Sequence, residues 1–359
     1  ACAGGGKSES EIRAALHGSH SPLAGTGMPT QFGAEDPADR GPVGLFNVES
    51  VGEFERLDRL ANELGVAARV AVRVNPDVDA KTHPYTTTGR ARNKFGIALA
   101  DAESLYTRWA RDRADGEPGA HPVGLHMHIG SPVYAPEPFA EATRALVSAA
   151  GRLREAGSAV ELLDLGGGWP SAYEPEQVRD LGVFADAVAS ELGEELERGT
   201  AIHLEPGRSI IANCGLLLTR VEYVKRTPAK RFLICDAGMH ALLRPSLYGA
   251  AHPVWPVRAA SGPFAEGAVE QCDPLPSDVV GPICETGDFL ATDRLLPVVE
   301  PGDLLAVFGT GAYGMSMAST YNQHPRPAEV IIQPDGSARL IRRRETPADL
   351  LREESDIDQ

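Results

Sequence analysis

From residue 1 to about residue 210, short runs of apolar and β-branched residues alternate with longer amphipathic stretches. Five of the short runs occupy residues 44–50, 68–76, 123–130, 160–168 and 201–209. A strand followed by a helix, repeated along the chain, is typical of βα units that build a parallel sheet. The pattern therefore predicts a parallel β/α domain over residues 1–210.

The stretches between these runs show the caps and apolar faces of surface helices. Ser8 with Glu11, and Ser50 with Glu53, have the spacing of the capping box that starts a helix. Apolar residues then recur at helical spacing in two stripes, and we expect both stripes to pack in the core. The stripes are Phe54, Leu57, Leu60 and Leu64, and Val178, Leu181, Phe184, Val188 and Leu192.

After residue 210 the pattern changes to strands joined by turns, without long helices between them. Such runs are "GLLLTRVEYVKR", "RFLICDAG", "DLLAVFGTG" and "AEVIIQPDGSARLIRR". They predict a second, mainly antiparallel β domain over residues 211–359. Residues 17–41 are rich in Gly, Pro and Ser and are predicted to form a mobile loop.

Composition limits the class of protein. The 359 residues are 42% hydrophobic, enough for a sizeable core, and the formal charge of −16 argues against a nucleic-acid or anionic-membrane partner. The sequence shows no apolar run long enough to span a bilayer and no signal-peptide pattern, so a cytoplasmic protein is expected. The five cysteines form no CxxC pair and predict neither a disulfide framework nor a zinc site.

Polar residues and glycines gather where the predicted strands end. Asn75, His128, Gly166–Gly168, Glu205 and Arg208 all occupy such positions. In a parallel β/α barrel the carboxyl ends of the strands meet at one mouth, so these residues are expected to converge. The exposed amides of the glycine run "DLGGG" could bind a phosphate, although tight turns use the same residues.

Two further stretches suggest ligand chemistry. Glu205 of "HLEPGRS" could pair with a protonated ring nitrogen, and Arg208 could extend an anion site, although an isolated EPGR is also an ordinary surface turn. In "HMHIGS", His126 and His128 lie on the same strand face. The spacing suits a metal, but no Glu or Cys close by in sequence completes a ligand set, so we predict no metal and favour ring stacking by His128.

"GPICETGD" at 281–288 sets Cys284 beside Glu285, with Asp288 close behind. Anionic neighbours disfavour a thiolate, so Cys284 is a poor nucleophile and a better proton donor. A buried structural cysteine beside surface acids is the alternative.

Together these motifs resemble the fold-type III pyridoxal-phosphate decarboxylases, most closely the branch that decarboxylates diaminopimelate. The similarity covers nearly the whole chain in matching order, and it includes "FNVES", "HMHIGS", "LDLGGGWP", "EPGRSIIANCG", "DAGMHALLRPSLYGAAHP", "GPICETGD" and "GTGAYGMSMAST". It implies a (β/α)8-type barrel followed by a β domain. It also implies decarboxylation of meso-diaminopimelate to lysine and CO2, the last step of lysine biosynthesis, with pyridoxal 5'-phosphate.

The resemblance assigns roles to individual residues. His128 would lie against the pyridine ring, Glu205 would pair with the ring nitrogen, and glycine amides with Arg208 would hold the phosphate. The implied cofactor-binding residues are His128, Ser131, Gly167, Gly168, Glu205, Pro206, Gly207, Arg208 and Tyr313. The implied substrate-binding residues are Arg208, Arg244, Tyr248, Glu285 and Tyr313.

Charge refines the substrate. A guanidinium such as that of Arg244 binds a carboxylate with two hydrogen bonds, which fits the distal carboxylate of diaminopimelate. Ornithine and lysine have no distal carboxylate, so Arg244 argues against them as substrates. Glu285 would face the distal ammonium. A surface salt bridge is the alternative role for Arg244.

The resemblance also implies a homodimer with shared active sites. Cys284 would act as the catalytic acid that protonates the carbanion in the partner's site. Asp288 would pair with Lys94 across the interface. A monomer would then be inactive.

Three features depart from the family pattern. The lysine that binds the cofactor, expected in a Tyr-Ala-x-Lys-Ala stretch, is absent, and "ACAGGGK" reads as the end of the third barrel strand and its turn. We therefore expect a barrel lacking its first two strands and a chain that is inactive alone. Pro132 replaces a glutamine, which puts one hydrogen bond near the cofactor in doubt. The alternatives are a decarboxylase of another carboxylated amino acid and an inactive fragment or regulatory homologue.

Overall fold

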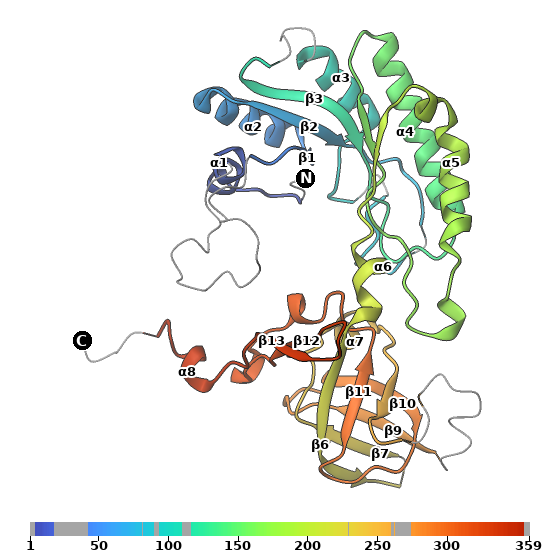
Figure 1. Ribbon diagram of the computed structural model, residues 1–359, viewed down its shortest axis with the longest axis vertical. Helices are drawn as coiled ribbons and strands as arrows, with labels where there is room; N and C mark the ends of the chain where they lie inside the picture. Colours follow the sequence, from blue (N-terminus) through green and yellow to red (C-terminus); the bar gives the residue numbers. More distant parts are fainter. Residues whose placement is uncertain are drawn as a thin grey trace. The chain divides into compact units, whose positions relative to one another are not determined.

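The computed structural model describes residues 4–17, 42–80, 82–89, 93–109, 116–228, 230–259, 262 and 274–354. The chain divides into two compact units (Figure 1). The first comprises residues 1–170 and 180–206, and the second comprises residues 171–179 and 207–359. The division thus falls after Pro206, and a short segment from the first half of the chain joins the second unit. The predicted mobile loop lies outside the described residues apart from His17.

The first unit contains a parallel sheet of five strands in sequential order. The strands are β1 Phe46–Val48, β2 Ala67–Arg73, β3 Gly119–His126, β4 Leu162–Asp164 and β5 Ala201–His203. β1, β4 and β5 lie within predicted runs, β2 begins one residue before its run, and β3 begins four residues before its run and shares only residues 123–126 with it. The predicted α/β fold is confirmed, and β1 and β5 are the edges of this sheet among the described residues.

Helices alternate with the strands of this unit. They are α1 Glu9–His17, α2 Val51–Leu64, α3 Leu99–Trp109, α4 Glu137–Glu155 and α5 Leu181–Glu197. The capping box at α1 is confirmed, because the Ser8 amide donates to Glu11 Oε2 (2.7 Å) and the Glu11 amide donates to Ser8 Oγ (3.3 Å). At α2 the Ser50 hydroxyl accepts from the Glu53 amide, but the Glu53 carboxylate accepts from the Glu49 amide instead of the cap.

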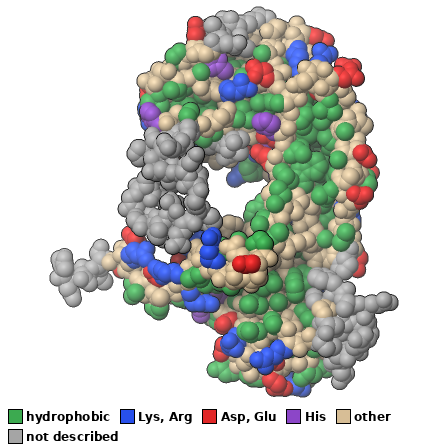
Figure 2. Space-filling model, in the orientation of Figure 1, with side chains coloured by type: hydrophobic (Ala, Val, Ile, Leu, Met, Phe, Trp, Pro, Cys, Tyr) green, Lys and Arg blue, Asp and Glu red, His purple; other side chains and the backbone are tan. Residues whose placement is uncertain are grey.

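Of the two predicted apolar stripes, the first is confirmed, with Phe54, Leu57 and Leu60 buried. The second is only partly right. Phe184, Val188 and Leu192 are buried, whereas Val178 and Leu181 are 66% and 49% exposed. Because α5 begins only at Leu181, Val178 lies outside the helix and does not share its inner face. Figure 2 shows hydrophobic side chains at the surface over α4 and α5.

The second unit is built on a six-stranded sheet in the order β10-β9-β7-β6-β11-β8. Its strands are β6 Leu216–Arg226, β7 Arg231–Cys235, β8 Val254–Pro256, β9 Leu275–Val280, β10 Phe289–Leu296 and β11 Leu304–Phe308. All neighbouring pairs are antiparallel except β7 with β9. The prediction of a mainly antiparallel domain is confirmed.

Shorter elements complete the second unit. They are the helices α6 Gly207–Ile211, α7 Arg244–Tyr248 and α8 Pro347–Leu350, the antiparallel hairpin β12 Glu329–Ile332 with β13 Ala338–Arg342, and single 3₁₀ turns. Among the residues described in both units, no helix has the length and apolar character needed to cross a membrane.

Aromatic packing holds α4 and α5 onto the first sheet. Phe139 of α4 is fully buried, stacks on Trp169 with ring centroids 4.5 Å apart, and meets Phe184 of α5 edge-on at 5.9 Å. Stacked and edge-to-face pairs of this kind add to the stabilisation from burial alone. Phe139 therefore joins both helices to the loop that follows β4.

Replacing Phe139 with alanine is expected to lower the free energy of unfolding by about 3–5 kcal/mol, because a buried ring is lost and a cavity remains. Val183→Ala on α5 is the matched control, since Val183 is 52% exposed and should change stability by only about 0.5 kcal/mol. Urea unfolding followed by circular dichroism measures both. Equal losses in the two variants would contradict this account of the core.

Candidate functional site

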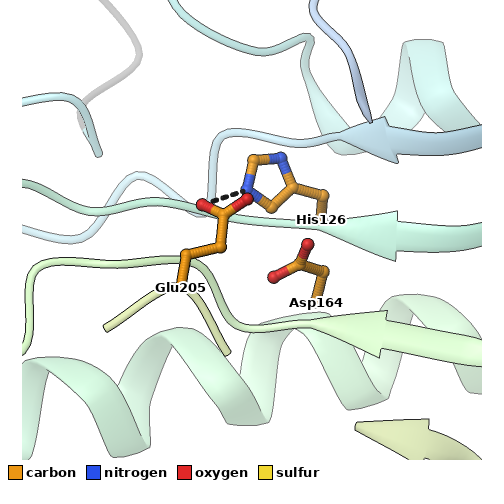
Figure 3. A group of neighbouring side chains, drawn as sticks. All are labelled: His126, Asp164 and Glu205. Atoms are coloured by element: carbon orange, nitrogen blue, oxygen red, sulfur yellow. Dashed lines mark ion pairs between the residues drawn. The ribbon is translucent and has the colours of Figure 1, made fainter. Parts of the chain in front are cut away.

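Three side chains from successive strand ends meet in the first unit. His126 is the last residue of β3, Asp164 the last of β4, and Glu205 follows β5 by two residues. The strands pair in register, so that His126 lies opposite Asp164 and Asp164 opposite His203. The three side chains point toward one another (Figure 3), with donor or acceptor atoms all within 4.8 Å.

The side chains of Asn47 and His126 contact the Glu205 carboxylate. The Asn47 amide, from β1, donates to Glu205 Oε1 at 3.3 Å and to Asp164 Oδ2 at 3.1 Å. His126 Nε2 lies 3.5 Å from Glu205 Oε2. His126 is 2% exposed, whereas 35% of the Glu205 side chain is accessible. Asn47 and His126 thus contact the Glu205 carboxylate, and part of the Glu205 side chain remains accessible to solvent.

The surroundings keep Glu205 ionised. Its contact with the His126 imidazole lowers the pKa of Glu205 below the ordinary value of 4.5, against the opposing effect of burial, and His128 and Arg73 act in the same direction as His126. An ionised carboxylate is the partner that a protonated ring nitrogen needs.

The reason given from the sequence for excluding a metal is wrong. It relied on the lack of a Glu or Cys close to the two histidines, but Asp164 and Glu205 approach His126 from the ends of other strands. These atoms are close enough to ligate an ion. The Asn47 amide, however, already donates to both carboxylates, and amide donors of this kind stabilise carboxylates without a cation. A site without metal stays our prediction.

The glycine turn after β4 exists because backbones pass very close together. A Cβ added at Gly166 would lie 2.0 Å from the Met127 carbonyl oxygen, and one at Gly168 would lie 2.1 Å from that of Gly130. Both glycines also have positive φ values, 68° and 95°. Only glycine fits both demands.

The expected exposed amides of this turn need correction. Residues 166–168 are buried, the Gly166 amide donates to Asp164 Oδ1 (2.9 Å), and the Gly167 amide donates to His128 Nδ1 (3.0 Å). The two amides orient neighbouring side chains in this structure. Phosphate binding by Gly167 and Gly168 stays a prediction.

His128 lies against the glycine turn. Since its Nδ1 accepts from the Gly167 amide, the neutral ring carries its proton on Nε2. Its backbone carbonyl accepts from the Thr88 hydroxyl at 2.6 Å. The ring is therefore fixed in orientation, as stacking on a planar ligand requires. Ser131 is half-buried in the same strand-end loop.

The predicted cofactor residues belong to both units. His128, Ser131, Gly167, Gly168, Glu205 and Pro206 belong to the first, and Gly207, Arg208 and Tyr313 to the second. Gly207 opens α6, and Tyr313 has φ 59° and is 43% exposed.

Two buried arginines of the second unit share one tyrosine. Arg208 Nη1 donates to the Tyr173 hydroxyl at 2.8 Å, and the Arg208 guanidinium lies over the Tyr313 ring at 4.7 Å. The Arg244 guanidinium lies 4.8 Å above the Tyr173 ring. The two arginines are 8% and 5% exposed. The alternative of a surface salt bridge for Arg244 is wrong, and Tyr248 lies half-buried at the end of the same helix, α7.

Cys284 lies at the surface of the second unit. Its sulfur accepts from the Asn322 amide at 3.1 Å, and the neighbouring Glu285 carboxylate accepts from the Tyr321 hydroxyl at 2.7 Å. The hydrogen bond from Tyr321 to Glu285 raises the pKa of Tyr321. The alternative of a buried structural cysteine is wrong, because the thiol is exposed.

Asp288 holds its own loop. It is 4% exposed, and its two carboxylate oxygens accept from the amides of Met239 (2.6 Å) and Ile283 (2.7 Å). These bonds count against the predicted pair with Lys94 of a partner. Lys94 is exposed in the first unit, with its ammonium 5.0 Å from the Phe95 ring.

Sequence reasoning missed several residues of the site. Asn47, His126 and Asp164 lie inside quoted motifs but received no role in the cofactor site, and only the register of neighbouring strands shows that they meet Glu205. Tyr173 lies outside those motifs, and His252, the next-to-last residue of "DAGMHALLRPSLYGAAHP", has no assigned role. No local signal separates these residues from ordinary core positions.

Comparisons with known proteins identify the class and then the family. A family model described as "Pyridoxal-dependent decarboxylase, pyridoxal binding domain" matches residues 36–212. Diaminopimelate decarboxylase of Pseudomonas aeruginosa is 47% identical over 316 residues, covering 87% of this chain and 71% of that protein. That of Neisseria meningitidis serogroup A is 45% identical over 305 residues, covering 85% and 70%.

A solved structure supports the same family. The crystal structure of diaminopimelate decarboxylase from Helicobacter pylori complexed with L-lysine superimposes with a TM-score of 0.80 at 37% identity, covering 97% of this chain and 76% of that one. The chain therefore belongs to the diaminopimelate decarboxylase family. Its cofactor is pyridoxal 5'-phosphate, and the ionised Glu205 beside a fixed imidazole fits a protonated pyridine ring.

The lowered pKa of Glu205 predicts a pH-dependent contribution to stability. Because the folded pKa lies below 4.5, this contribution is complete above pH 4.5 and disappears as the pH falls through the lower folded value. Compared with Glu205→Gln, the wild-type chain should therefore lose stability more steeply below pH 4.5. Urea unfolding at pH values on both sides of 4.5 measures the difference.

The control for this prediction is His126→Gln, alone and combined with Glu205→Gln. If His126 is the main cause, the two substitutions should not be additive. Additive effects, or identical pH profiles for wild type and Glu205→Gln, would contradict the assignment.

Proposed function

We propose that this protein decarboxylates meso-diaminopimelate to lysine and CO2 with pyridoxal 5'-phosphate. The observation that carries the proposal is the ionised Glu205, held by Asn47 and His126 at the ends of parallel strands. It occurs in a chain that is 43–47% identical to diaminopimelate decarboxylases from several bacteria.

Pyridoxal phosphate, when bound, supplies a ring that accepts the electron pair left by departing CO2. Glu205 keeps a proton on the ring nitrogen because the carboxylate stays ionised. His128 would stack on the ring, and the Gly167 amide already sets the orientation of its imidazole. We assign phosphate binding to Gly167, Gly168, Gly207 and Arg208, and supporting contacts to Ser131, Pro206 and Tyr313.

The substrate's far end meets charged groups of the second unit in this proposal. Arg208 and Arg244 bind the distal carboxylate, which suits the planar guanidinium, and Glu285 binds the distal ammonium. Tyr248 and Tyr313 complete the contacts. The burial of both arginines supports this role, because hydrogen bonds to charged groups strengthen away from water.

We also propose a homodimer in which Cys284 donates a proton to the carbanion in the partner's site. The exposed thiol supports delivery to another chain. The β12–β13 hairpin exposes Val330, Ile332 and Leu340 by more than half, an apolar surface of the kind that partners cover.

The proposal places the enzyme in the cytoplasm, where free thiols such as those of Cys214 and Cys284 persist. Cell fractionation checks this, and recovery from an oxidising compartment would contradict it.

The 359 residues lack the Tyr-Ala-x-Lys-Ala stretch of the family, so the chain alone is expected to be inactive on meso-diaminopimelate. An added primary amine, ethylamine, should raise the rate because it replaces the missing lysine amine. The assay supplies pyridoxal phosphate and compares meso-diaminopimelate with lysine, ornithine and arginine. CO2 should come from meso-diaminopimelate alone.

Two results would change the proposal in different ways. A full rate without ethylamine would show that the lysine is not needed, and the substrate assignment would stand. CO2 release only from amino acids without a second carboxylate, or from none with or without ethylamine, would overturn the function.

In the ethylamine-supplemented assay, Cys284→Ala should lower the rate by about 10²–10⁴-fold, the usual loss when a general acid is removed. Cys214→Ala is the matched control, since Cys214 is also exposed and should keep full activity. Mixing Cys284→Ala with Glu205→Gln should restore about a quarter of the wild-type rate, because random dimers then contain some intact shared sites. No recovery on mixing would show that Cys284 serves its own chain.

A further inference from the structure

His252 lies against the arginine pair of the second unit and has no role in the reaction described so far. It is 1% exposed, its Nε2 lies 2.7 Å from Arg244 Nη1, and its Nδ1 lies 2.8 Å from the Phe308 carbonyl oxygen. Its ring meets Tyr173 edge-on at 5.1 Å. Both ring nitrogens of this buried histidine are therefore engaged.

The two partners determine the protonation of His252. A carbonyl oxygen only accepts, so Nδ1 carries the proton, and a guanidinium only donates, so Nε2 must accept. Burial, together with the positive charges of Arg244 and Arg208, lowers the pKa of His252 to about 4, although its bond to Phe308 acts in the opposite direction. The ring is neutral at physiological pH, with a single tautomer.

Tyr173 connects His252 to the second arginine. Its hydroxyl accepts from Arg208 at 2.8 Å, while its ring lies beneath the Arg244 guanidinium at 4.8 Å. The same residue borders a cavity of about 390 Å³ that is also lined by Asn213, Pro253 and Phe308. A histidine, a tyrosine and two arginines thus form one continuous set of contacts inside one unit.

We propose that His252 and Tyr173 are positioning residues that orient Arg244 and Arg208 for the carboxylate at the far end of the substrate. Both partners are neutral, so they direct the guanidinium N–H groups without cancelling their charge. An acidic partner in place of His252 would compete with a bound carboxylate for the same donors. The inference rests on the proposed function, because it names residues that serve the carboxylate site of that reaction.

Two substitutions at His252 separate its two hydrogen bonds. Asparagine places a donor near the Nδ1 position and keeps the bond to Phe308, but offers nothing to Arg244. Glutamine places an acceptor near the Nε2 position and keeps the bond to Arg244. Comparing the two variants therefore separates the effect of orienting Arg244 from the effect of filling the space that the imidazole occupies.

The readout is binding, measured by calorimetry on the full chain saturated with pyridoxal phosphate. L-lysine and cadaverine serve as probes because they differ by one carboxylate. His252→Asn should raise the Kd of L-lysine about tenfold, the effect of losing roughly one oriented charged hydrogen bond. His252→Gln should stay close to wild type, and the Kd of cadaverine should not change in either variant.

Tyr173→Phe is a second, independent variant. It keeps the ring beneath Arg244 and removes only the acceptor for Arg208. This variant should also raise the Kd of L-lysine and leave the Kd of cadaverine unchanged. Thermal unfolding of all variants shows whether the fold is retained.

The outcomes separate this inference from the proposed function. If wild type does not prefer L-lysine to cadaverine, the carboxylate site fails and the proposed function fails with it. If wild type shows the preference but His252→Asn and Tyr173→Phe keep it, only the positioning role is overturned. An equal rise in the Kd of both probes would also overturn the positioning role, because it would show a merely structural effect. The same holds if His252→Asn and His252→Gln change the Kd of L-lysine equally.

Discussion

The close approach of backbones at the glycine turn after β4 is the constraint on which the predicted cofactor site depends. Gly166 and Gly168 lie so near the loop after β3 that a Cβ at either position would collide with a carbonyl oxygen. This contact lets the ends of β3, β4 and β5 stay in register beyond the sheet, with the Glu205 amide donating to the Gly166 carbonyl at 2.9 Å. The side chains that leave those ends therefore converge on Glu205.

Within each unit, charged side chains are oriented by neutral ones. In the first unit the Asn47 amide holds the Glu205 carboxylate, and in the second His252 and Tyr173 contact the two arginines. A neutral partner directs a charged group and leaves its charge in place. In the first unit, His126 also helps to keep the Glu205 carboxylate charged, because its contact lowers the pKa of Glu205. The arrangement suits a cofactor and a substrate that both carry charges.

The loop around Cys284 follows a different principle. Asp288 is buried, and its carboxylate accepts from the amides of Ile283 in the loop and of Met239 outside it, so the loop is fixed to a second segment of the chain. The residues at its tip, Cys284 and Glu285, stay exposed and contact Asn322 and Tyr321. A rigid base with an exposed thiol is consistent with a group that acts on something outside its own unit.

Much of the architecture could be predicted from local pattern. Alternating strand and helix runs indicated β1 to β5, and the capping box at Ser8 was recognisable because it needs only residues three apart. The second apolar stripe failed at Val178 and Leu181, because spacing alone does not show where a helix begins. The hydrogen bonds of Asp288 were missed for a similar reason, since its amide partner at Met239 is far away in sequence.

By itself, the sequence determined the α/β character of the first unit, the β character of the second and the family, and it predicted chemical roles for Glu205, Arg208, Arg244 and Cys284. These follow from hydrophobic period and from motifs that are continuous in the chain. Only the tertiary structure decided that Asn47, His126 and Asp164 gather around Glu205, and that His252 and Tyr173 contact the arginines. Such contacts depend on strand register and loop approach, which bring together residues that no local pattern relates.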